Sequence, residues 1–540
     1  MLRRDETHMP GAQWIVLIAL AIMLLPWLGL TLFYSKGEPR EAIVAMSMLQ
    51  SGDWILPLSY GQDMPYKPPF MAWIIAALAW LLNGGVVNEY ISRLPSALAA
   101  LAMAMGGFAW ARRANGTRFA MIFALVTACS FEVFRASVAC RVDMVLTACM
   151  VGAVYIMYNI REYSPKRKGL LYLAVIVLLT CATLTKGPVG ALLPCFAIGV
   201  FRLLRGDAFF PTLFKMLGLA VLSIALTSWW YILAWQRGGD DFYHLMYEEN
   251  IDRLLGKMSY ESHVKPFWYN FVTLIAGLLP WTLLLMASCF SLRKARLSAL
   301  RSPGMLSAVT AVITIGFYCI PASKRSVYLL PAYPFICYGI TCILNGKTPL
   351  RPIRFFAWLM AVLAIAAPLA IVALRIWPQS GLTLASVPWW GYIVLMLPLA
   401  TGVAWFCNRH SPVGHILVAV WTLLTAYMAV GMPAVLNPKS DYRAIPTLTA
   451  DPEAEIITLY TAITDITHST TTSATASAQY RLPRPPHIRR ELSCSAPPTP
   501  TPQDWLHTTA SSRCSTALPT TATPWYSAQE NRKKKRLPSP

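Results

Sequence analysis

A few charged residues interrupt the long apolar runs of this sequence, and they are the first candidates for chemistry. Glu38 and Arg40 follow such a run in YSKGEPR, and Lys67 stands a little later in YKPP. A carboxylate there can accept the proton of a hydroxyl group or bind a cation, and an arginine can hold a phosphate with two hydrogen bonds. The alternatives are a surface ion pair for Glu38 with Arg40 and an interfacial anchor for Lys67.

Three further charges are flanked closely by apolar residues. Arg141 and Asp143 open an apolar run in ACRVDMVL, and Lys186 separates two other runs in LTKGPVG. Ionisable groups at membrane depth are costly, so they are candidates for function by default. The alternative for Arg141 and Asp143 is a neutralising pair that only fixes the orientation of a helix.

Two later segments add more charge. Glu248, Arg253 and His263 precede the sequence PFWY, and Lys324 with Arg325 stands in PASKRSVYLLP. A histidine among carboxylates can ligate a metal, but a solvated loop histidine is the simpler interpretation. Several separate cations on one face would suit a phosphorylated ligand whose body lies in lipid.

The elements that position these charges must lie in a membrane. The chain has 540 residues, of which 56% are hydrophobic and only 13% are charged, against roughly 25% charged residues in soluble proteins. A span takes about 20 apolar residues, so the length accommodates a dozen or more spans. This composition excludes a soluble enzyme, a fibrous chain and a disulfide framework. The net charge of +21 then indicates cytoplasmic loops that face anionic lipid, and no nucleic-acid partner is expected.

About thirteen runs are long and apolar enough to span a membrane. They lie near residues 13–33, 93–111, 119–134, 143–160, 169–185, 188–201, 213–235, 269–291, 304–320, 328–345, 355–375, 389–407 and 414–431. Basic loops follow the even-numbered spans, which predicts a cytoplasmic N-terminus and a first span that is retained as an anchor. Two long polar loops, 34–92 and 236–268, then lie on the outer face with the candidate charges.

The first outer loop and the C-terminal tail have distinct compositions. Residues 42–49 and 70–82 are apolar but too short to span comfortably, so we expect helices that lie along the outer membrane surface. Residues 451–540 contain long Thr/Ser/Pro-rich stretches and no span, which predicts disorder. The alternative for this tail is an out-of-frame reading that replaces a natural soluble domain.

Nucleotide and zinc motifs are missing from the sequence. It contains no GxxxxGK[ST] motif and no glycine-rich nucleotide loop, so neither ATP nor a nucleotide sugar is indicated. Any energy for a reaction must come with the substrate. The 12 cysteines lack the paired short spacings of a zinc site. We therefore assign no metal ligands.

Motifs along most of the chain resemble one known family. GEPREAIVAMSMLQSGDWILP and YKPPFMAW resemble the first periplasmic loop of bacterial lipid A aminoarabinose transferases and of the wider protein O-mannosyltransferase-like enzymes of the GT-C class. RVDMVLT, LTKGPVG, EENIDRLLG, HVKPFWYNFVTLIAGLLPW and SKRSVYLLPAYP follow in the family's order. The resemblance covers roughly residues 13–445 and implies an all-α GT-C bundle of about thirteen spans within a membrane domain, 1–445, followed by a periplasmic soluble domain.

The resemblance also implies a reaction. Such enzymes transfer a sugar from a polyprenyl-phosphate donor to a lipid A-like glycolipid, a glycan or a protein hydroxyl at the periplasmic face of the bacterial inner membrane. By this resemblance Glu38 and Asp143 are the candidate catalytic acids, while Arg40 and Lys67 match residues of the phosphate-binding first loop. Other cations that would bind the donor phosphate are Lys186, Arg253, Lys324 and Arg325.

Two positions depart from the family pattern. The family signature begins with Asp-Glu, and Gly37 occupies the Asp position. Tyr66 replaces the acid before the loop lysine, which weakens the case for a metal site and leaves a divalent cation as an open question. If the missing Asp is the family's base, Glu38 or Asp143 must act in its place. We therefore expect Glu38→Gln to abolish transfer without lowering the amount of protein in the membrane.

Two other classes of protein stay open at this point. One is a transporter or flippase for a lipid-linked or anionic solute, although the sequence shows no internal repeat with matching broken spans. The other is an inactive assembly subunit, which Gly37 and the unusual tail favour.

Overall fold

The structure, a computed structural model, describes residues 11–35, 37–59, 64–65, 67–252, 264–292, 302–346, 350–376, 389–408 and 411–440. All of these residues fall within one unit, Met1–Leu482. In this part of the chain every regular element is a helix, and one isolated antiparallel bridge joins Val264 to Ser323. The expected all-α class is confirmed.

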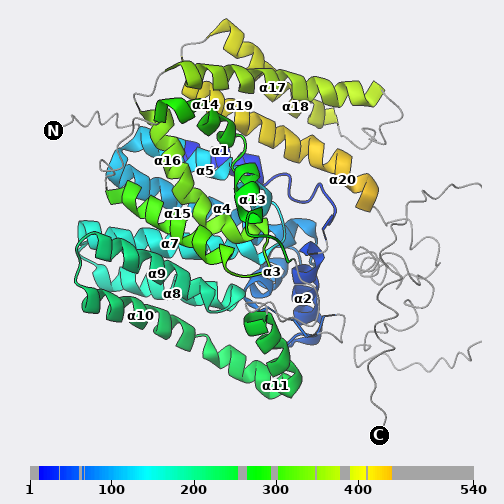
Figure 1. Ribbon diagram of the computed structural model, residues 1–540. Helices are drawn as coiled ribbons and strands as arrows, with labels where there is room; N and C mark the ends of the chain where they lie inside the picture. The colour runs from blue at the N-terminus through cyan, green and yellow to red at the C-terminus, as the bar shows by residue number, and fades with distance from the viewer. Residues whose placement is uncertain are drawn as a thin grey trace, which may run out of the picture. The chain divides into compact units, whose positions relative to one another are not determined.

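The helices before residue 253 carry the candidates Glu38, Arg40, Asp143 and Lys186 (Figure 1). They are α1 (Ala12–Leu24), α2 (Glu38–Ser51), α3 (Phe70–Leu82), α4 (Glu89–Asn115), α5 (Thr117–Ala128), α6 (Phe131–Ser137), α7 (Val142–Tyr163), α8 (Lys168–Lys186), α9 (Val189–Leu204), α10 (Phe209–Ala225), α11 (Ser228–Tyr247) and the π-helical turn η1 (Glu248–Asp252).

The later helices complete the bundle. They are α13 (Tyr269–Gly277), α14 (Trp281–Leu292), α15 (Ser302–Cys319), the 3₁₀ helix η3 (Ser326–Ala332), α16 (Tyr333–Asn345), α17 (Leu350–Ile376), α18 (Trp389–Cys407), α19 (Pro412–Ala426), the π-helical turn η6 (Tyr427–Gly431) and α20 (Met432–Ser440).

The expected spans correspond to these helices. Among the described residues, 9 helices are long and apolar enough to cross a membrane, or up to 11 if each of two bent pairs is one span. The bent pairs are α5 with α6, at 70°, and α13 with α14, at 101°. The two remaining expected spans, 13–33 and 188–201, contain the shorter apolar helices α1 and α9. Every expected span therefore has an apolar helical counterpart.

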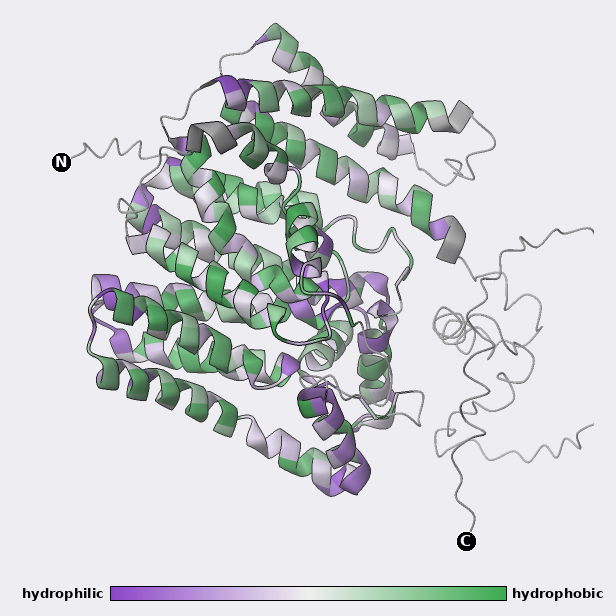
Figure 2. Cartoon of the chain, in the orientation of Figure 1, coloured by the Kyte–Doolittle hydropathy of each residue, from purple (hydrophilic) through white to green (hydrophobic). Residues whose placement is uncertain are grey.

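Apolar side chains on the flanks of the long helices face outward. On α8, Leu170, Leu173 and Val177 are exposed, whereas Val175 and Leu179 are buried. Hydrophobic residues cover the helix flanks and hydrophilic ones gather at the helix ends (Figure 2). Such a surface would be unstable in water but matches the hydrocarbon of a bilayer.

Small residues let some helices approach each other at backbone distance. A Cβ added to Gly190 of α9 would lie 2.5 Å from the carbonyl carbon of Ala182 on α8, and one added to Gly402 of α18 would lie 2.6 Å from Ile365 on α17. Small residues at such crossings are typical of helices that pack in membranes. These contacts hold neighbouring spans in fixed register.

The bend between α5 and α6 is stabilised by side chains that satisfy its free backbone groups. The carbonyl of Val126 accepts hydrogen bonds from the indole of Trp281 and from the hydroxyl of Ser130, both at 2.9 Å. The amide of Phe131 donates to the carbonyl of Leu279 at 2.9 Å, so the breaks of the two bent pairs meet. Backbone groups inside a membrane must be paired in this way.

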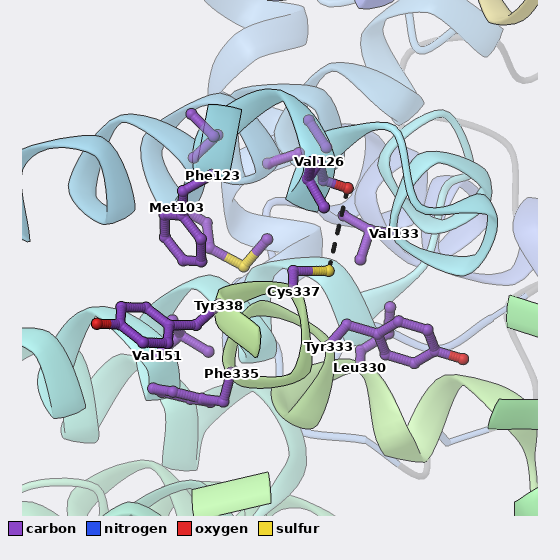
Figure 3. Packing of buried hydrophobic residues seen from close by; sticks show 14 of the residues in the cluster. Met103, Phe123, Val126, Val133, Val151, Leu330, Tyr333, Phe335, Cys337 and Tyr338 are labelled. Carbon is purple, nitrogen blue, oxygen red and sulfur yellow. Dashed lines mark hydrogen bonds between the residues drawn. The ribbon is translucent and has the colours of Figure 1, made fainter. Parts of the chain in front are cut away.

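Helix α16 packs on the same region. Cys337 lies against α5 with its Sγ 4.0 Å from the carbonyl of Val126, beside Phe123 and Met103 (Figure 3). Tyr333 and the other labelled side chains of α16 belong to the same buried hydrophobic cluster. This packing holds α16 against the end of α5, next to the bend that leads into α6.

Helices are present at both expected positions, as α2 and α3, at the same end of the bundle as α13 (Figure 1). Their location along the outer membrane surface stays a prediction. One expectation needs correction, because residues 236–252, assigned to a polar loop, are helical in α11 and η1. The end of the proposed membrane domain after residue 440 and the tail 451–540 lie outside the described residues.

Candidate functional site

Four carboxylates are buried in the described part of the chain, and each forms an ion pair with a different cation. We call these four pairs the acid cluster. They are Glu38 with Arg93, Glu41 with Lys67, Glu132 with Arg135, and Asp143 with Lys186. The cluster draws on the starts of α2, α4 and α7, on α6 and on the end of α8.

Glu38 is the most enclosed of the four acids. Its side chain is 0% exposed, and Arg93, 1% exposed, donates from Nε to its Oε1 at 3.1 Å and from Nη2 to its Oε2 at 3.3 Å. The backbone amides of Cys140 and Tyr34 donate to the same carboxylate at 3.1 Å and 3.4 Å. Both oxygens of Glu38 are therefore engaged.

Arg93 ties this pair to the chain between α1 and α2. Its guanidinium also donates to the backbone carbonyls of Leu28, Thr31 and Leu32. The arginine thus donates hydrogen bonds to three backbone carbonyls and to the carboxylate of Glu38, in a site that water does not reach. A buried ion pair is tolerated when such additional hydrogen bonds complete it.

Asp143 is placed differently. It lies in the first turn of α7, where a negative charge is favoured by the helix dipole. Lys186, the last residue of α8, brings its Nζ to 2.5 Å from Oδ1 of Asp143 and to 4.1 Å from the ring centre of Tyr328. The sequence alternative of a neutralising pair between Arg141 and Asp143 is wrong, because Lys186 takes that role.

Lys67 approaches α2 from the loop before α3. Its Nζ lies 2.6 Å from Oε1 of Glu41, and the two side chains are 23% and 6% exposed. The lysine therefore keeps part of its surface open while its acid is covered. Glu41 was not among the candidates from the sequence, although it lies only three residues after Glu38.

The fourth pair lies on α6, beyond the bend of its span. Arg135 pairs with Glu132 at 2.5 Å and donates to the hydroxyl of Ser326 in η3 at 3.3 Å. Residues 119–134 were expected to form one span, and neither Glu132 nor Arg135 was among the candidate residues. An acid and an arginine three positions apart in an apolar run were the available signal.

Tyr34 and Cys140 lie between the pairs and are affected by them. Burial and the charge of Glu38 raise the pKa of Tyr34 to about 12, against the opposing effect of Arg93, Arg135 and Arg141. Burial, with Glu38 and Glu41, also holds the pKa of the Cys140 thiol well above its ordinary value. Both groups stay protonated at neutral pH, so neither can act as a base.

The other predicted phosphate ligands are only partly in view. Lys324 is 5% exposed and donates from Nζ to the carbonyl of Pro321 at 2.6 Å. Arg40 and Arg325 each interact with other residues. Arg253 and His263 lie outside the described residues.

The turn after Lys186 brings the second long loop to this region. Gly187 has a positive φ of 85°, and a Cβ added there would lie 3.0 Å from Oδ1 of Asn250 in η1. A side chain at this position would be strained and would collide with η1. Gly187 therefore permits the close contact of η1 with the end of α8.

The described residues do not fit a divalent cation. They contain no group of three or more His, Cys, Asp or Glu side chains placed to hold a metal ion. The four buried carboxylates face lysine or arginine instead.

Comparisons with known proteins agree with the motifs. Residues 66–232 match the family described as dolichyl-phosphate-mannose-protein mannosyltransferase. The chain is 27% identical to the undecaprenyl phosphate-alpha-4-amino-4-deoxy-L-arabinose arabinosyl transferase of Photorhabdus laumondii, over 75% of this chain and 76% of the relative. It is 25% identical to an uncharacterized protein of Aquifex aeolicus, over 65% and 68% of the two chains.

A solved structure decides the fold. The crystal structure of ArnT from Cupriavidus metallidurans bound to undecaprenyl phosphate superposes with a TM-score of 0.65 at 21% identity, covering 82% of this chain and 81% of that one. The fold is that of a GT-C glycosyltransferase. In sequence the chain resembles the lipid A aminoarabinose transferases, as the order of its motifs predicts.

The family match and the acid cluster overlap. Lys67, Arg93 and Asp143 lie inside the matched segment 66–232, and each of the four ion pairs has at least one member there. Glu38 and Glu41 precede the matched segment but are joined to it by their cations. The acid cluster is therefore our candidate site in this GT-C bundle.

Proposed function

We propose that the chain is a glycosyltransferase that moves a sugar from a polyprenyl-phosphate donor to a hydroxyl acceptor at the periplasmic face of the bacterial inner membrane. The observation that carries this proposal is the acid cluster, which gathers carboxylates and partly exposed cations at one end of a GT-C bundle. The names of the similar transferases support the polyprenyl-phosphate donor.

Cations in the cluster would stabilise the departing phosphate. Lys67 and Lys186 have side chains that are 23% and 22% exposed, so they can contact a ligand while remaining tied to Glu41 and Asp143. Positive groups fixed where negative charge develops are a large source of catalysis. Arg40, Lys324 and Arg325, with Arg253, remain candidates for the same role.

A carboxylate would accept the proton of the acceptor hydroxyl. Among our two candidates Asp143 fits this role better than Glu38. Lys186 engages one oxygen of Asp143, and the side chain is 10% exposed, whereas the carboxylate of Glu38 is fully buried and has four hydrogen-bond donors. We assign Asp143 as the general base and Glu38 as a positioning residue.

The identity of the sugar is open to direct test. The similar transferases are named for 4-amino-4-deoxy-L-arabinose, so a pentose donor is the first to try and a hexose donor the second. Lipid A-like glycolipids are the first acceptors, followed by glycans and protein hydroxyls. The choice of donor and acceptor does not affect the assignment of Asp143.

Transfer is tested with purified, reconstituted full-length protein and labelled undecaprenyl-phosphate sugars. Acceptor-dependent release of undecaprenyl phosphate is the expected result. Asp207→Asn is a matched control, because Asp207 is also an aspartate paired with cations but lies at the other end of α7. Donor binding without release, for every donor and acceptor tried, would favour a transporter or an inactive subunit.

The proposed orientation has its own test. We expect position 67 to face the periplasm and positions 167 and 351 to face the cytoplasm, because basic loops stay inside. Single cysteines at these positions, in a background without the native cysteines, should be labelled by an impermeant thiol reagent only at 67 in intact cells. Labelling at 351 instead of 67 would contradict the periplasmic site.

A further inference from the structure

Arg141 is the arginine beside the acid cluster that has no acid of its own among the described residues. The four neighbouring cations each pair with a carboxylate, and the guanidinium of Arg141 makes one hydrogen bond, from Nη2 to the hydroxyl of Ser35 at 3.2 Å. A guanidinium carries five N–H donors. Most of the donors of Arg141 are therefore available to a ligand.

Gly37 leaves room next to this guanidinium. A Cβ added to Gly37 would lie 3.5 Å from Cζ and Nη2 and 3.7 Å from Nη1 of Arg141, and these are the three atoms nearest to it. Distances of this kind are ordinary van der Waals contacts. The φ of Gly37 is −94°, which any residue can adopt. The backbone thus does not require glycine here, and an atom of a ligand could take the place of the missing Cβ in contact with the guanidinium. We call this position the gap.

The local helix geometry makes this gap more positive. Gly37 is the residue before α2 and Arg141 is the residue before α7, and neither helix start has a side-chain cap. The first amides of a helix carry partial positive charge. Glu38 and Asp143, which lie in the first turns of these helices, form their ion pairs with Arg93 and Lys186, so neither carboxylate forms an ion pair with Arg141.

We propose that the gap between Gly37 and Arg141 binds an oxyanion, a carboxylate or a phosphate, with Arg141 as its ligand. We place this oxyanion on the substrate, a part of the proposal that rests on the proposed transferase function. A planar guanidinium holds such groups with two parallel hydrogen bonds. The site would then select a sugar or an acceptor that carries a negative group close to the reacting atoms.

Binding of the oxyanion is measured first, in the absence of turnover. This measurement does not depend on the proposed transferase function. The melting temperature of the purified full-length protein is followed as acetate or inorganic phosphate replaces chloride at constant ionic strength. A ligand that binds the folded state raises this temperature by mass action. We expect a saturable rise of about 1–2 °C for the wild-type protein.

Variants at Gly37 separate charge from volume. Gly37→Asp places a carboxylate against Arg141, so we expect a higher starting melting temperature and no further rise with acetate or phosphate. Gly37→Ala adds only a methyl group, so its response should be close to that of the wild type. Arg141→Gln should lose the response, and Gly37→Asp keeps the test valid if Arg141→Gln does not fold. Equal responses in wild type and Gly37→Asp would overturn the proposal.

Turnover then identifies the source of the anion. If the substrate carries the oxyanion, acetate should compete with the substrate. Gly37→Asp should lower kcat/KM by at least about tenfold, equivalent to about 1.4 kcal/mol. The neutral variant Gly37→Asn should lower kcat/KM less. Acetate that raises turnover would assign the same site to a free anion. A gain of turnover in Gly37→Asp would overturn the proposal, because it would mean that the site lacks an acid. If no turnover is found with any donor, the transferase proposal fails while the melting experiment still decides binding.

Discussion

The two ends of α7 each carry a group of ion pairs, and the acids of the two groups differ in burial. At its start lies the acid cluster, whose acids are 0% to 10% exposed. At its end lies a second group, the arginine cluster, in which Arg161, Arg202 and Arg205 pair with Glu162 and Asp207, and the acids are 16% to 20% exposed. Ion pairs at the protein surface contribute little, whereas buried ones are costly to break.

The distance between the two groups is close to the thickness of the hydrocarbon core of a bilayer. Asp143 and Arg161 are separated by 18 positions of one helix, which corresponds to about 27 Å at 1.5 Å per residue. The hydrocarbon core of a bilayer is about 30 Å thick. We therefore predict that the two clusters lie at the two faces of the membrane, with the arginine cluster on the side of the basic loops. The more deeply buried acids then belong to the candidate site on the opposite side.

The largest effect is expected at the most buried pair. Glu38→Gln leaves the charge of Arg93 in a site where both partners are at most 1% exposed, and breaking a buried pair costs about 3–5 kcal/mol. We expect a lower melting temperature of the solubilised protein and less of it in the membrane. This differs from the sequence-based expectation that Glu38→Gln would leave the amount of protein unchanged.

The matched control lies on the same helix. Glu41→Gln removes an acid that is 6% exposed, but its partner Lys67 is 23% exposed and can turn to water. The loss of stability should therefore be clearly smaller. Equal losses of stability in the two variants would show that burial does not distinguish the two ion pairs. A Glu38→Gln variant that is stable but inactive would return Glu38 to the role of catalytic base.

A second prediction concerns catalysis. Asp143→Asn keeps the size of the side chain but removes the base, so we expect turnover to fall by about 10²–10⁴-fold with a smaller loss of stability than in Glu38→Gln. Transfer and melting temperature are measured on the same preparation, with Asp207→Asn beside it. Near wild-type turnover in Asp143→Asn would contradict the assignment of the base.

A third prediction concerns the donor phosphate. Lys67→Met removes a charge that is partly open to a ligand, and hydrogen bonds to charged groups contribute about 1.5–3 kcal/mol. We expect weaker binding of undecaprenyl phosphate, measured by competition with labelled donor, by about tenfold or more. Lys67→Arg retains the charge and should recover part of the affinity. Unchanged affinity in Lys67→Met would remove this residue from the phosphate site.

Hydropathy was sufficient for the spans and for the helical state of α2 and α3, because long apolar runs have few alternatives in a membrane. It was not sufficient for the site. Arg93 appeared only as the first residue of a span, and its partner Glu38 lies 55 positions earlier, so the pair depends on how α2 packs against α4. Of the two bends, only the one at Pro280 carries a local signal.

Glu132 and Arg141 show the same limit of prediction from the sequence. Glu132 lies in an apolar run, and the rule that intramembrane acids need a partner could have selected it. Arg141 was selected, but its missing partner and the gap at Gly37 depend on the packing of two helix starts. Sequence spacing therefore identified the charges that matter without showing which of them are paired.

The smallest effect is expected in the arginine cluster. Arg161 and Arg202 hold Asp207 at 2.6 Å and 2.8 Å. Partial burial raises the pKa of Asp207, but its hydrogen bonds and the arginine charges outweigh burial and lower the pKa below its ordinary value. Because the folded-state pKa is depressed, this carboxylate stabilises the protein above the ordinary pKa of an aspartate, about 3.9, and the contribution is lost as the pH falls through the lowered value.

Asp207→Asn should therefore lower stability at pH 7 by less than about 1 kcal/mol, as for pairs near the surface. The difference in melting temperature between the variant and the wild type should shrink as the pH falls below about 4. A loss at pH 7 as large as that of Glu38→Gln would mean that the two ends of α7 are equally enclosed, and the distinction between a buried site and a solvated helix end would have to be abandoned.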